Sequence, residues 1–148
     1  MKVRVLKPED VEQVGNALGL ARLGQGNGFY LVAWRDDEPV GHLHLALTDP
    51  PELQDVQVAA GHRRRGVARM LVVAAEREAR ARGFTRIRVD VAIDNHPAQA
   101  LYRTCGFSDL GLDPRPVKGT VVIRTGRIEV DDVLVTWGKY LTRGTRSP

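Results

Sequence analysis

The sequence predicts an α/β (α+β) domain built on a mixed, mostly antiparallel twisted sheet of about six to seven strands, with helices on both faces. Two observations carry this expectation. Short apolar segments bounded by turn residues are typical of strands, whereas other segments repeat apolar residues at helical spacing. These segments follow one another in the order β-α-β-β-β-α-β-α-β-β, and hairpins combined with helical crossovers imply such a mixed sheet.

The first half of the chain predicts a strand, a helix and a hairpin. Residues 3–6 indicate a short strand, and Pro8 then opens a helix whose apolar stripe extends to Ala21. The glycine-rich stretch 24–28 ends that helix, because glycine accepts positive φ angles. Strands at 29–34 and 40–47 form the hairpin.

The second half begins after Pro50 and Pro51, which break the chain. We expect a strand at 53–59, and the strongest helix at 66–82, where Gly83 is a natural C-terminal stop. A strand at 87–91 and a short helix at 97–104 follow. The remaining elements are a short strand at 107–110, a segment at 113–127 rich in Pro, Gly and Thr, a terminal strand at 130–141 and a loose tail at 142–148.

Length and composition limit the class of protein. The 148 residues suit one domain spanning 1–148, and 43% hydrophobic with 27% charged residues is typical of a globular chain. No apolar run approaches the roughly 20 residues that span a bilayer, and the N-terminus lacks the apolar core of a secretory signal. We therefore expect a cytoplasmic protein with no membrane partner. The single cysteine, Cys105, excludes an intramolecular disulfide.

Arginine dominates the positive charge. Twenty-two Lys and Arg against 18 Asp and Glu give a formal net charge of +4, and nine arginines lie between positions 63 and 88. Such a cluster indicates either an anionic partner or a solvated helix face. The favourable i,i+4 pairs Glu76–Arg80 and Glu78–Arg82 suit the solvated alternative. These acids, and an aromatic content of only 5%, argue against a nucleic-acid surface.

The junction at 58–68 is the sharpest local feature. A strand is expected to run through a tight turn directly into a helix, whose first N–H groups have no intrahelical acceptor. Those groups and the helix dipole favour an anion. Gly66 and Ala68 are small enough for close approach of a phosphate, and Arg63, Arg64 and Arg65 add positive charge. The alternative interpretation is a tight turn with solvated arginines.

A second pattern follows the strand expected at 87–91. It reads Asn95-x-x-Ala98-x-x-Leu101-Tyr102-x-x-x-Gly106-Phe107. Arg63-x-x-Gly66-x-Ala68 resembles the acyl-CoA pyrophosphate loop of the GNAT superfamily of N-acetyltransferases, and the second pattern resembles that family's second motif. The separation of the two motifs by one helix and one strand is also similar. The resemblance covers residues 40–107 in detail and the first strand and helix in outline.

The resemblance implies the cofactor and its binding residues. In this family the fourth and fifth strands splay apart, and acetyl-CoA enters the gap as co-substrate. Backbone N–H groups of residues 64–69 would hold its pyrophosphate, and residues 56–58 would pair with its pantetheine arm like an added strand. The implied cofactor-binding residues are Val56, Gln57, Val58, Arg63, Arg64, Arg65, Gly66, Val67, Ala68, Arg69, Asn95, Ala98, Tyr102 and Arg103.

The resemblance also implies that Tyr102 donates a proton to the departing thiolate; the alternative is that its ring only packs beneath the cofactor. Asn95 either contacts pantetheine or only caps the helix that follows it. Arg103 either reaches a phosphate or is solvated. Cys105 is expected to be a small buried residue rather than a nucleophile.

An amine acceptor must lose a proton before it attacks, so a base is needed. Glu52 and Asp55 are the candidate catalytic bases, and strand alternation places Asp55 on the face opposite Glu52. His42 and His44 are further candidates, each of which can instead be a polar residue at the sheet surface. The two histidines lack a third ligand nearby in the sequence, so no metal site is expected.

Together these features predict an acetyl-CoA-dependent N-acetyltransferase that transfers acetyl to a primary amine of a small molecule or peptide by direct attack. The alternatives are a non-catalytic CoA-binding regulatory module and a basic nucleic-acid-binding domain. The short segment before residue 29 predicts that the family's usual second helix is missing or reduced. The segment 113–132 is expected to form a lid or hairpin over the acceptor site or an arm of a homodimer.

Overall fold

The computed structural model describes residues 1–21, 23–24, 26–123 and 126–141; the expected loose tail, 142–148, lies outside them. The strands are β1 (Lys2–Val5), β2 (Phe29–Arg35), β3 (Glu38–Ala46), β4 (Glu52–Val58), β5 (Arg86–Ala92), β6 (Ser108–Asp109), β7 (Arg115–Ile123) and β8 (Gly126–Tyr140). The helices are α1 (Val11–Leu18), α2 (Val67–Ala81) and α3 (His96–Thr104), with short 3-10 turns at Pro8–Asp10 and Ala60–His62.

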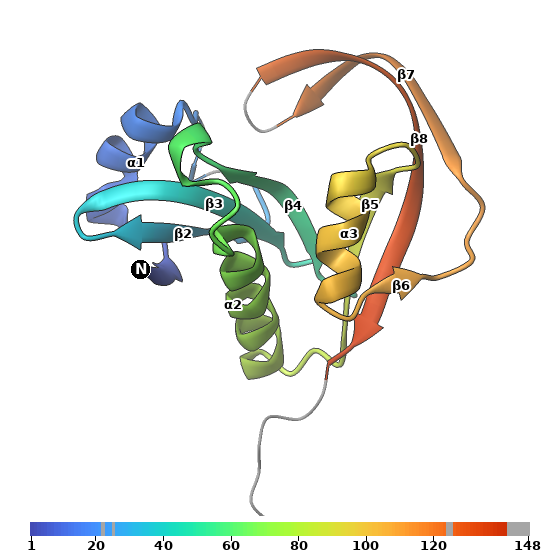
Figure 1. The fold of residues 1–148 in the computed structure, drawn as a ribbon, viewed down its shortest axis with the longest axis horizontal. Helices are drawn as coiled ribbons and strands as arrows, with labels where there is room; N and C mark the ends of the chain where they lie inside the picture. Colours follow the sequence, from blue (N-terminus) through green and yellow to red (C-terminus); the bar gives the residue numbers. More distant parts are fainter. Residues whose placement is uncertain (22, 25, 124–125, 142–148) are drawn as a thin grey trace, which may run out of the picture.

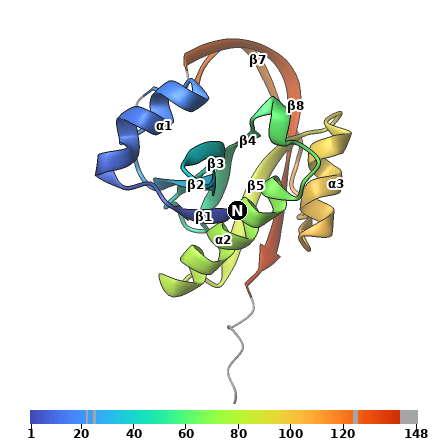
Figure 2. The same ribbon diagram turned by 60° about the vertical axis from the view of Figure 1, so that its left-hand side comes forward.

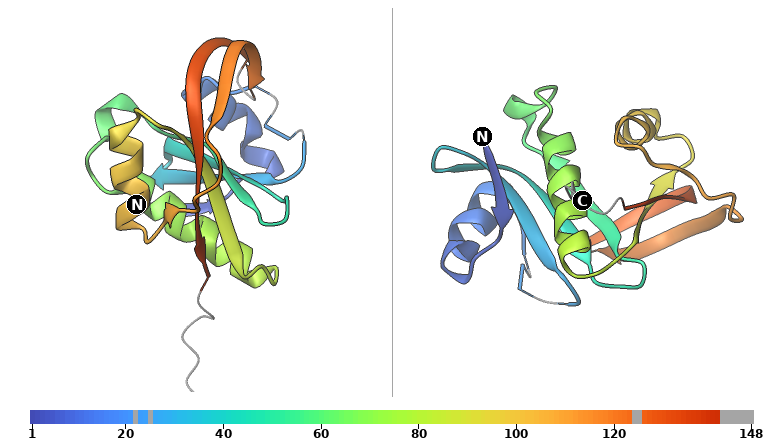
Figure 3. Two further views of the ribbon diagram at one scale, coloured as in Figure 1. Left: turned by 90° about the vertical axis from the view of Figure 1, so that its right-hand side faces the viewer. Right: turned by 90° about the horizontal axis from the view of Figure 1, so that it is seen from below.

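The strands form one sheet in the order β1-β2-β3-β4-β5-β8-β6, with β7 paired to β8. Every pair is antiparallel except β4 with β5, which is parallel. That parallel pair is short: only Glu52 opposite Arg88 and Leu53 opposite Val89 are in register. Beyond these residues the two strands diverge, which divides the sheet into two halves around a gap (Figure 3).

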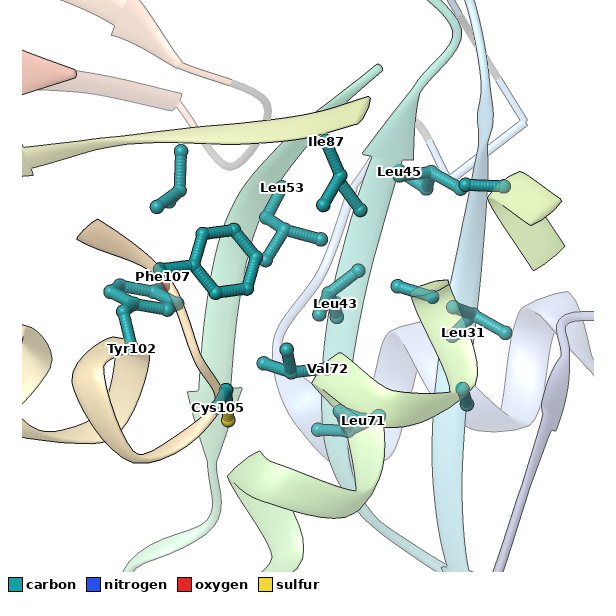
Figure 4. Close-up of a cluster of buried hydrophobic side chains, with 14 of the residues drawn as sticks. Leu31, Leu43, Leu45, Leu53, Leu71, Val72, Ile87, Tyr102, Cys105 and Phe107 are labelled. Carbon is teal, nitrogen blue, oxygen red and sulfur yellow. The ribbon is translucent and has the colours of Figure 1, made fainter. Parts of the chain in front are cut away.

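Helices cover both faces of the sheet (Figures 1 and 2). Helix α1 packs its buried Val14 against a small core with Tyr30, Val32 and Trp34 of β2. Helices α2 and α3 lie on the opposite face, over the main core. That core joins α2 to the inward side chains of the central strands (Figure 4). The predicted fold class is therefore confirmed.

The end of helix α1 differs from expectation. Helix α1 ends at Leu18 rather than near Ala21, because Gly19 adopts φ 67° and its N–H bonds the Gly15 carbonyl as a left-handed cap. The described residues between α1 and β2 form no helix, as expected for this short segment.

The sheet has eight strands rather than six to seven, because residues 115–123 form β7. This strand pairs with β8 along its full length, from Arg115 opposite Leu134 to Ile123 opposite Gly126. Strand β8 accordingly starts at Gly126 instead of residue 130. The long, curved β7–β8 hairpin extends beyond the rest of the sheet (Figure 3). The segment thus forms a β-hairpin.

A buried ion pair joins the two halves of the molecule. Glu76 of α2 is only 5% exposed, and its carboxylate forms an ion pair with the Lys139 ammonium of β8. The same ammonium donates a hydrogen bond to the Cys105 carbonyl at 2.8 Å. The predicted ion pair between Glu76 and Arg80 is wrong, because the Glu76 side chain faces the core rather than solvent. The second expected pair, Glu78 with Arg82, is present at 3.1 Å.

We predict that Lys139→Met destabilises the protein by about 3 kcal/mol, since it leaves the Glu76 carboxylate buried without its partner. Adding Glu76→Met should recover much of this loss, because two apolar side chains replace the pair without an unpaired charge. Urea unfolding monitored by tryptophan fluorescence measures both effects. Equal stability of the single and double variants would contradict this account.

No helix among the described residues is long and apolar enough to cross a membrane.

Candidate active site

Two neighbouring cavities occupy the region where β4 and β5 diverge, and Tyr102 lines both. The first, called here the helix-start groove, has a volume of about 610 Å³ and lies between the end of β4, the start of α2 and α3. The second, the strand cavity, has a volume of about 550 Å³ and lies between β4 and β5. Tyr102 of α3 therefore lies at the boundary between the helix-start groove and the strand cavity.

The helix-start groove is built by a turn with an unusual backbone. Arg64 has φ 63° and Gly66 has φ 76°, so the chain bends sharply before α2 begins at Val67. No side chain caps α2, which leaves its first N–H groups directed toward the groove entrance. An ideal Cβ on Gly66 would meet no atom within 4 Å, so this backbone faces open space. Such an arrangement suits a phosphate.

Most residues expected to bind the cofactor line this groove. They are Val56, Gln57, Val58, Arg63, Arg64, Gly66, Val67, Ala68, Arg69, Ala98 and Tyr102. Within the same groove, the Arg63 side chain bends back and its Nε donates to the Val58 carbonyl at 3.1 Å. Pairing between β4 and β5 stops at Leu53, so the later residues of β4 offer backbone groups on the side of the gap.

Three of the expected cofactor residues lie elsewhere. Arg65 is exposed and does not line the groove. The Arg103 guanidinium lies over the Trp137 ring, 5.4 Å from its centroid, rather than at the groove. Asn95 lines the strand cavity instead, and its Oδ1 accepts a hydrogen bond from the Ala98 N–H at 3.2 Å. The helix-capping role of Asn95 is therefore present in the structure.

The Tyr102 side chain is 6% exposed and packs against Phe107, with ring centroids 5.7 Å apart (Figure 4). Burial, with a smaller contribution from Cys105, raises the pKa of Tyr102 to about 12. The phenol therefore keeps its proton throughout the neutral pH range. A neutral phenol at the boundary of the two cavities is able to donate a proton to an anion that forms there.

Carboxylates dominate the charge of the strand cavity: Glu52, Asp55 and Asp90 line it, and no cationic side chain is among its described lining residues. Two of the three have cationic partners just outside. Glu52 pairs with Arg88 at 3.1 Å, and Asp90 pairs with Arg115 of the β7–β8 hairpin at 2.9 Å. The hairpin thus contributes directly to the cavity's edge. The sequence predicted a lid or hairpin as one alternative for this segment, but it did not single out Arg115, because residue 115 lies in a segment without periodicity.

Asp55 differs from the other two acids. It adopts φ 52°, and the register between β3 and β4 shifts there, so that one residue of β3 opposes two of β4. This β-bulge re-aims the side chain. The Asp55 carboxylate accepts a hydrogen bond from the Tyr30 hydroxyl at 2.8 Å and lies 3.7 Å from His42 Nδ1. The expectation that Asp55 lies opposite Glu52 is therefore wrong: both belong to the face with Tyr30.

The same face holds His42 and His44, which are 5% and 1% exposed rather than at the sheet surface. His44 Nδ1 lies 3.1 Å from Gln54 Oε1, and both rings pack edge-on against Tyr30. Burial lowers the pKa of His42, and the nearby Asp55 only partly opposes this effect. Burial therefore favours the neutral form of the His42 ring, which lies beside Asp55.

Glu52 is the first residue of β4 and directly follows Pro51. Burial raises the pKa of Glu52, the Asp90 charge adds to this effect, and Arg88 opposes it. Among the described residues, no group of three or more His, Cys, Asp or Glu is placed to hold a metal ion.

We predict that Cys105 reacts slowly with iodoacetamide in the folded protein. The side chain is 9% exposed, and burial together with the Glu76 charge raises the pKa of its thiol, which reduces the reactive thiolate fraction. Mass spectrometry of native and urea-unfolded samples measures the rates. An iodoacetamide reaction rate in the native protein equal to that in the unfolded protein would contradict the burial of this thiol. The variant Cys105→Ala is expected to retain activity.

The divergent parallel strands, the uncapped helix start and the two cavities that share Tyr102 define a mixed α/β fold with a groove whose backbone suits a phosphate. The chain belongs to the acetyltransferase (GNAT) family, whose model matches residues 5–107.

Individual relatives agree with this assignment. The chain is 31% identical over 112 residues to the uncharacterized N-acetyltransferase YsnE of Bacillus subtilis (strain 168), covering 69% of this chain and 74% of that protein. It is 40% identical over 68 residues to a streptothricin acetyltransferase of Streptomyces lavendulae, covering 46% of this chain but only 36% of that protein. A Bacillus subtilis acetyltransferase solved in complex with CoA shares the fold, with a TM-score of 0.69 and 18% identity over 95% of this chain and 99% of that one.

Proposed function

We propose that the protein transfers an acetyl group from acetyl-CoA to a primary amine of a cationic acceptor. The observation that carries this proposal is the meeting of the two cavities at Tyr102. One cavity has an uncapped helix start that suits a diphosphate, and the other carries carboxylates that suit an ammonium group. Family membership supports acetyl-CoA as the donor.

In this proposal the cofactor lies in the helix-start groove. Backbone N–H groups between Arg64 and Arg69 bind its pyrophosphate, and the free edge of β4 near residues 56–58 binds its pantetheine arm. The thioester then lies near the boundary with the strand cavity. Residues Arg65 and Arg103 contribute little, since the structure directs them away from the groove.

The acceptor enters the strand cavity as an ammonium ion. Asp55 takes one of its protons, and the resulting amine attacks the thioester carbonyl. When the carbon–sulfur bond breaks, the thiolate takes the Tyr102 phenol proton. The second proton of the amide nitrogen passes through solvent to the Tyr102 phenolate, and Asp55 releases its proton to solvent, which restores both side chains. We assign the base to Asp55 rather than Glu52, because Glu52 forms an ion pair with Arg88, whereas Asp55 accepts a hydrogen bond from the Tyr30 hydroxyl and lies beside the buried His42 ring.

The carboxylates of the strand cavity suit an acceptor with a cationic group, carried by a small molecule or a peptide. The Streptomyces lavendulae relative is a streptothricin acetyltransferase, which makes streptothricin the first compound to test. A homodimer remains a prediction from the sequence, and sedimentation velocity of the purified chain measures it.

The test is a thiol-release assay with acetyl-CoA across amines of increasing positive charge, including streptothricin. We expect turnover with cationic primary amines and little with neutral ones. Acetyl-CoA binding, measured by calorimetry, without release on any amine would favour the non-catalytic CoA-binding module instead. Absence of acetyl-CoA binding would contradict both functions.

Asp55→Asn should lower kcat/KM for a basic amine by about 100-fold at pH 7, which is the usual size of a lost general base. Glu52→Gln is the comparison variant and should cost less. A larger loss in Glu52→Gln would transfer the base role to Glu52.

A further inference from the structure

Asp55 is held by side chains from two other strands, and these give it one orientation. Tyr30 of β2 is 1% exposed, and its hydroxyl donates to Asp55 Oδ2 at 2.8 Å. His42 of β3 is 5% exposed, and its Nδ1 lies 3.7 Å from the same oxygen. The Tyr30 ring lies edge-on to the His42 ring with centroids 5.8 Å apart, so the three side chains form one packed unit.

Both of these contacts involve Oδ2, and Asp55 also lines the strand cavity, so Oδ1 is not engaged in either of them. The positive φ of Asp55 costs backbone energy in a residue other than glycine, and the surrounding structure must compensate for it. A buried phenol directed at the carboxylate supplies such compensation through a hydrogen bond to a charged acceptor.

We infer that Tyr30 and His42 are positioning residues, which hold the Asp55 carboxylate toward the strand cavity so that it can accept the proton of the acceptor amine. This inference rests on the proposed function. Neither side chain lines the cavity itself, so each acts through Asp55. We therefore assign His42 the role of a positioning residue for Asp55 instead of that of a candidate base.

The inference predicts an effect that depends on pH. The charged and titratable groups near Asp55 come from several elements. They are Tyr30 of β2, His42 and His44 of β3, Glu52 of β4 with its partner Arg88, Asp90 of β5 with its partner Arg115, and Tyr102 of α3. Tyr30 and His42 contact Asp55 directly. Removing the Tyr30 hydroxyl therefore changes Asp55 while the ion pairs at the cavity's edge remain.

Tyr30→Phe keeps the buried ring and removes the hydrogen bond. We expect kcat/KM for a basic amine to fall about tenfold at pH 7, the equivalent of one hydrogen bond to a charged group. The gap to the wild type should close to less than about twofold near pH 10, because the amine then loses its proton without help. The calorimetric affinity for acetyl-CoA should not change. Tyr140→Phe, at a 78% exposed tyrosine, is the matched control and should behave as wild type.

Parallel pH profiles, with the same loss at every pH, would show a merely structural role for Tyr30 and overturn the inference. An unchanged kcat/KM would overturn it as well, while the proposed function would stand. A second measurement is independent of turnover: NMR titration of the His42 ring in wild type and Asp55→Asn. Because the Asp55 charge raises the pKa of His42, the variant should titrate at lower pH. Identical titrations would overturn the coupling even if no amine is acetylated and the proposed function has failed.

Discussion

Gly66→Val is expected to weaken acetyl-CoA binding by about 100-fold, the equivalent of one or two hydrogen bonds to a charged phosphate. Two physical effects act together. The φ of 76° is strained for a β-branched side chain, and the new methyl groups would project into the open space where the phosphate approaches. By contrast, Arg64→Ala and Arg65→Ala should each cost less than about fivefold, because exposed charges contribute little. Isothermal titration calorimetry measures all three variants.

Gly83→Val is the matched control for this experiment. Gly83 follows the opposite end of α2, has φ 88° and also has no atom within 4 Å of an ideal Cβ. Both variants should therefore lose similar stability in urea unfolding, but only Gly66→Val should lose affinity. If the two arginine variants weakened binding more than Gly66→Val, the pyrophosphate would be held by side chains and the backbone account would be wrong.

Tyr102→Phe should lower kcat by about 100-fold while the dissociation constant for acetyl-CoA stays near the wild-type value. The variant keeps the ring that packs on Phe107 and removes only the phenol proton. Because the pKa of Tyr102 is raised to about 12, the phenol is protonated from pH 6 to pH 10, and the loss should be constant over this range. Steady-state kinetics with a cationic amine, at saturating acetyl-CoA, measures it.

A constant loss also distinguishes Tyr102 from Tyr30, whose effect should fade at high pH. If Tyr102→Phe retained kcat, its side chain would only pack at the boundary of the cavities. Water would then protonate the thiolate.

Local patterns in the sequence predicted the helix-start groove well. The glycine at position 66, the small residue at 68 and the uncapped start of α2 are adjacent in the chain, so their geometry follows from short-range backbone rules. Asn95 was likewise recognised as a helix cap from its place before Pro97. The alternation of apolar residues in 29–47 predicted the β2–β3 hairpin for the same reason.

The strand cavity was predicted less completely. The bulge at Asp55 occurs without a glycine, and strand alternation therefore placed this side chain on the wrong face. Helical spacing assigned Glu76 to a solvated pair, whereas its partner Lys139 is 63 positions away in the chain. Arg115 reaches Asp90 across 25 positions, from a strand whose sequence has no period.

The sequence by itself determined where an uncapped helix start with small residues lies, within a mixed α/β domain. Backbone conformation over a few residues is sufficient for that conclusion. Only the tertiary structure decided how the strand cavity is charged, because Glu52 and Asp90 find their cationic partners on other strands, whereas Asp55 contacts Tyr30 and His42. Contacts between residues far apart in the chain arise from packing and strand register, and no local pattern encodes them.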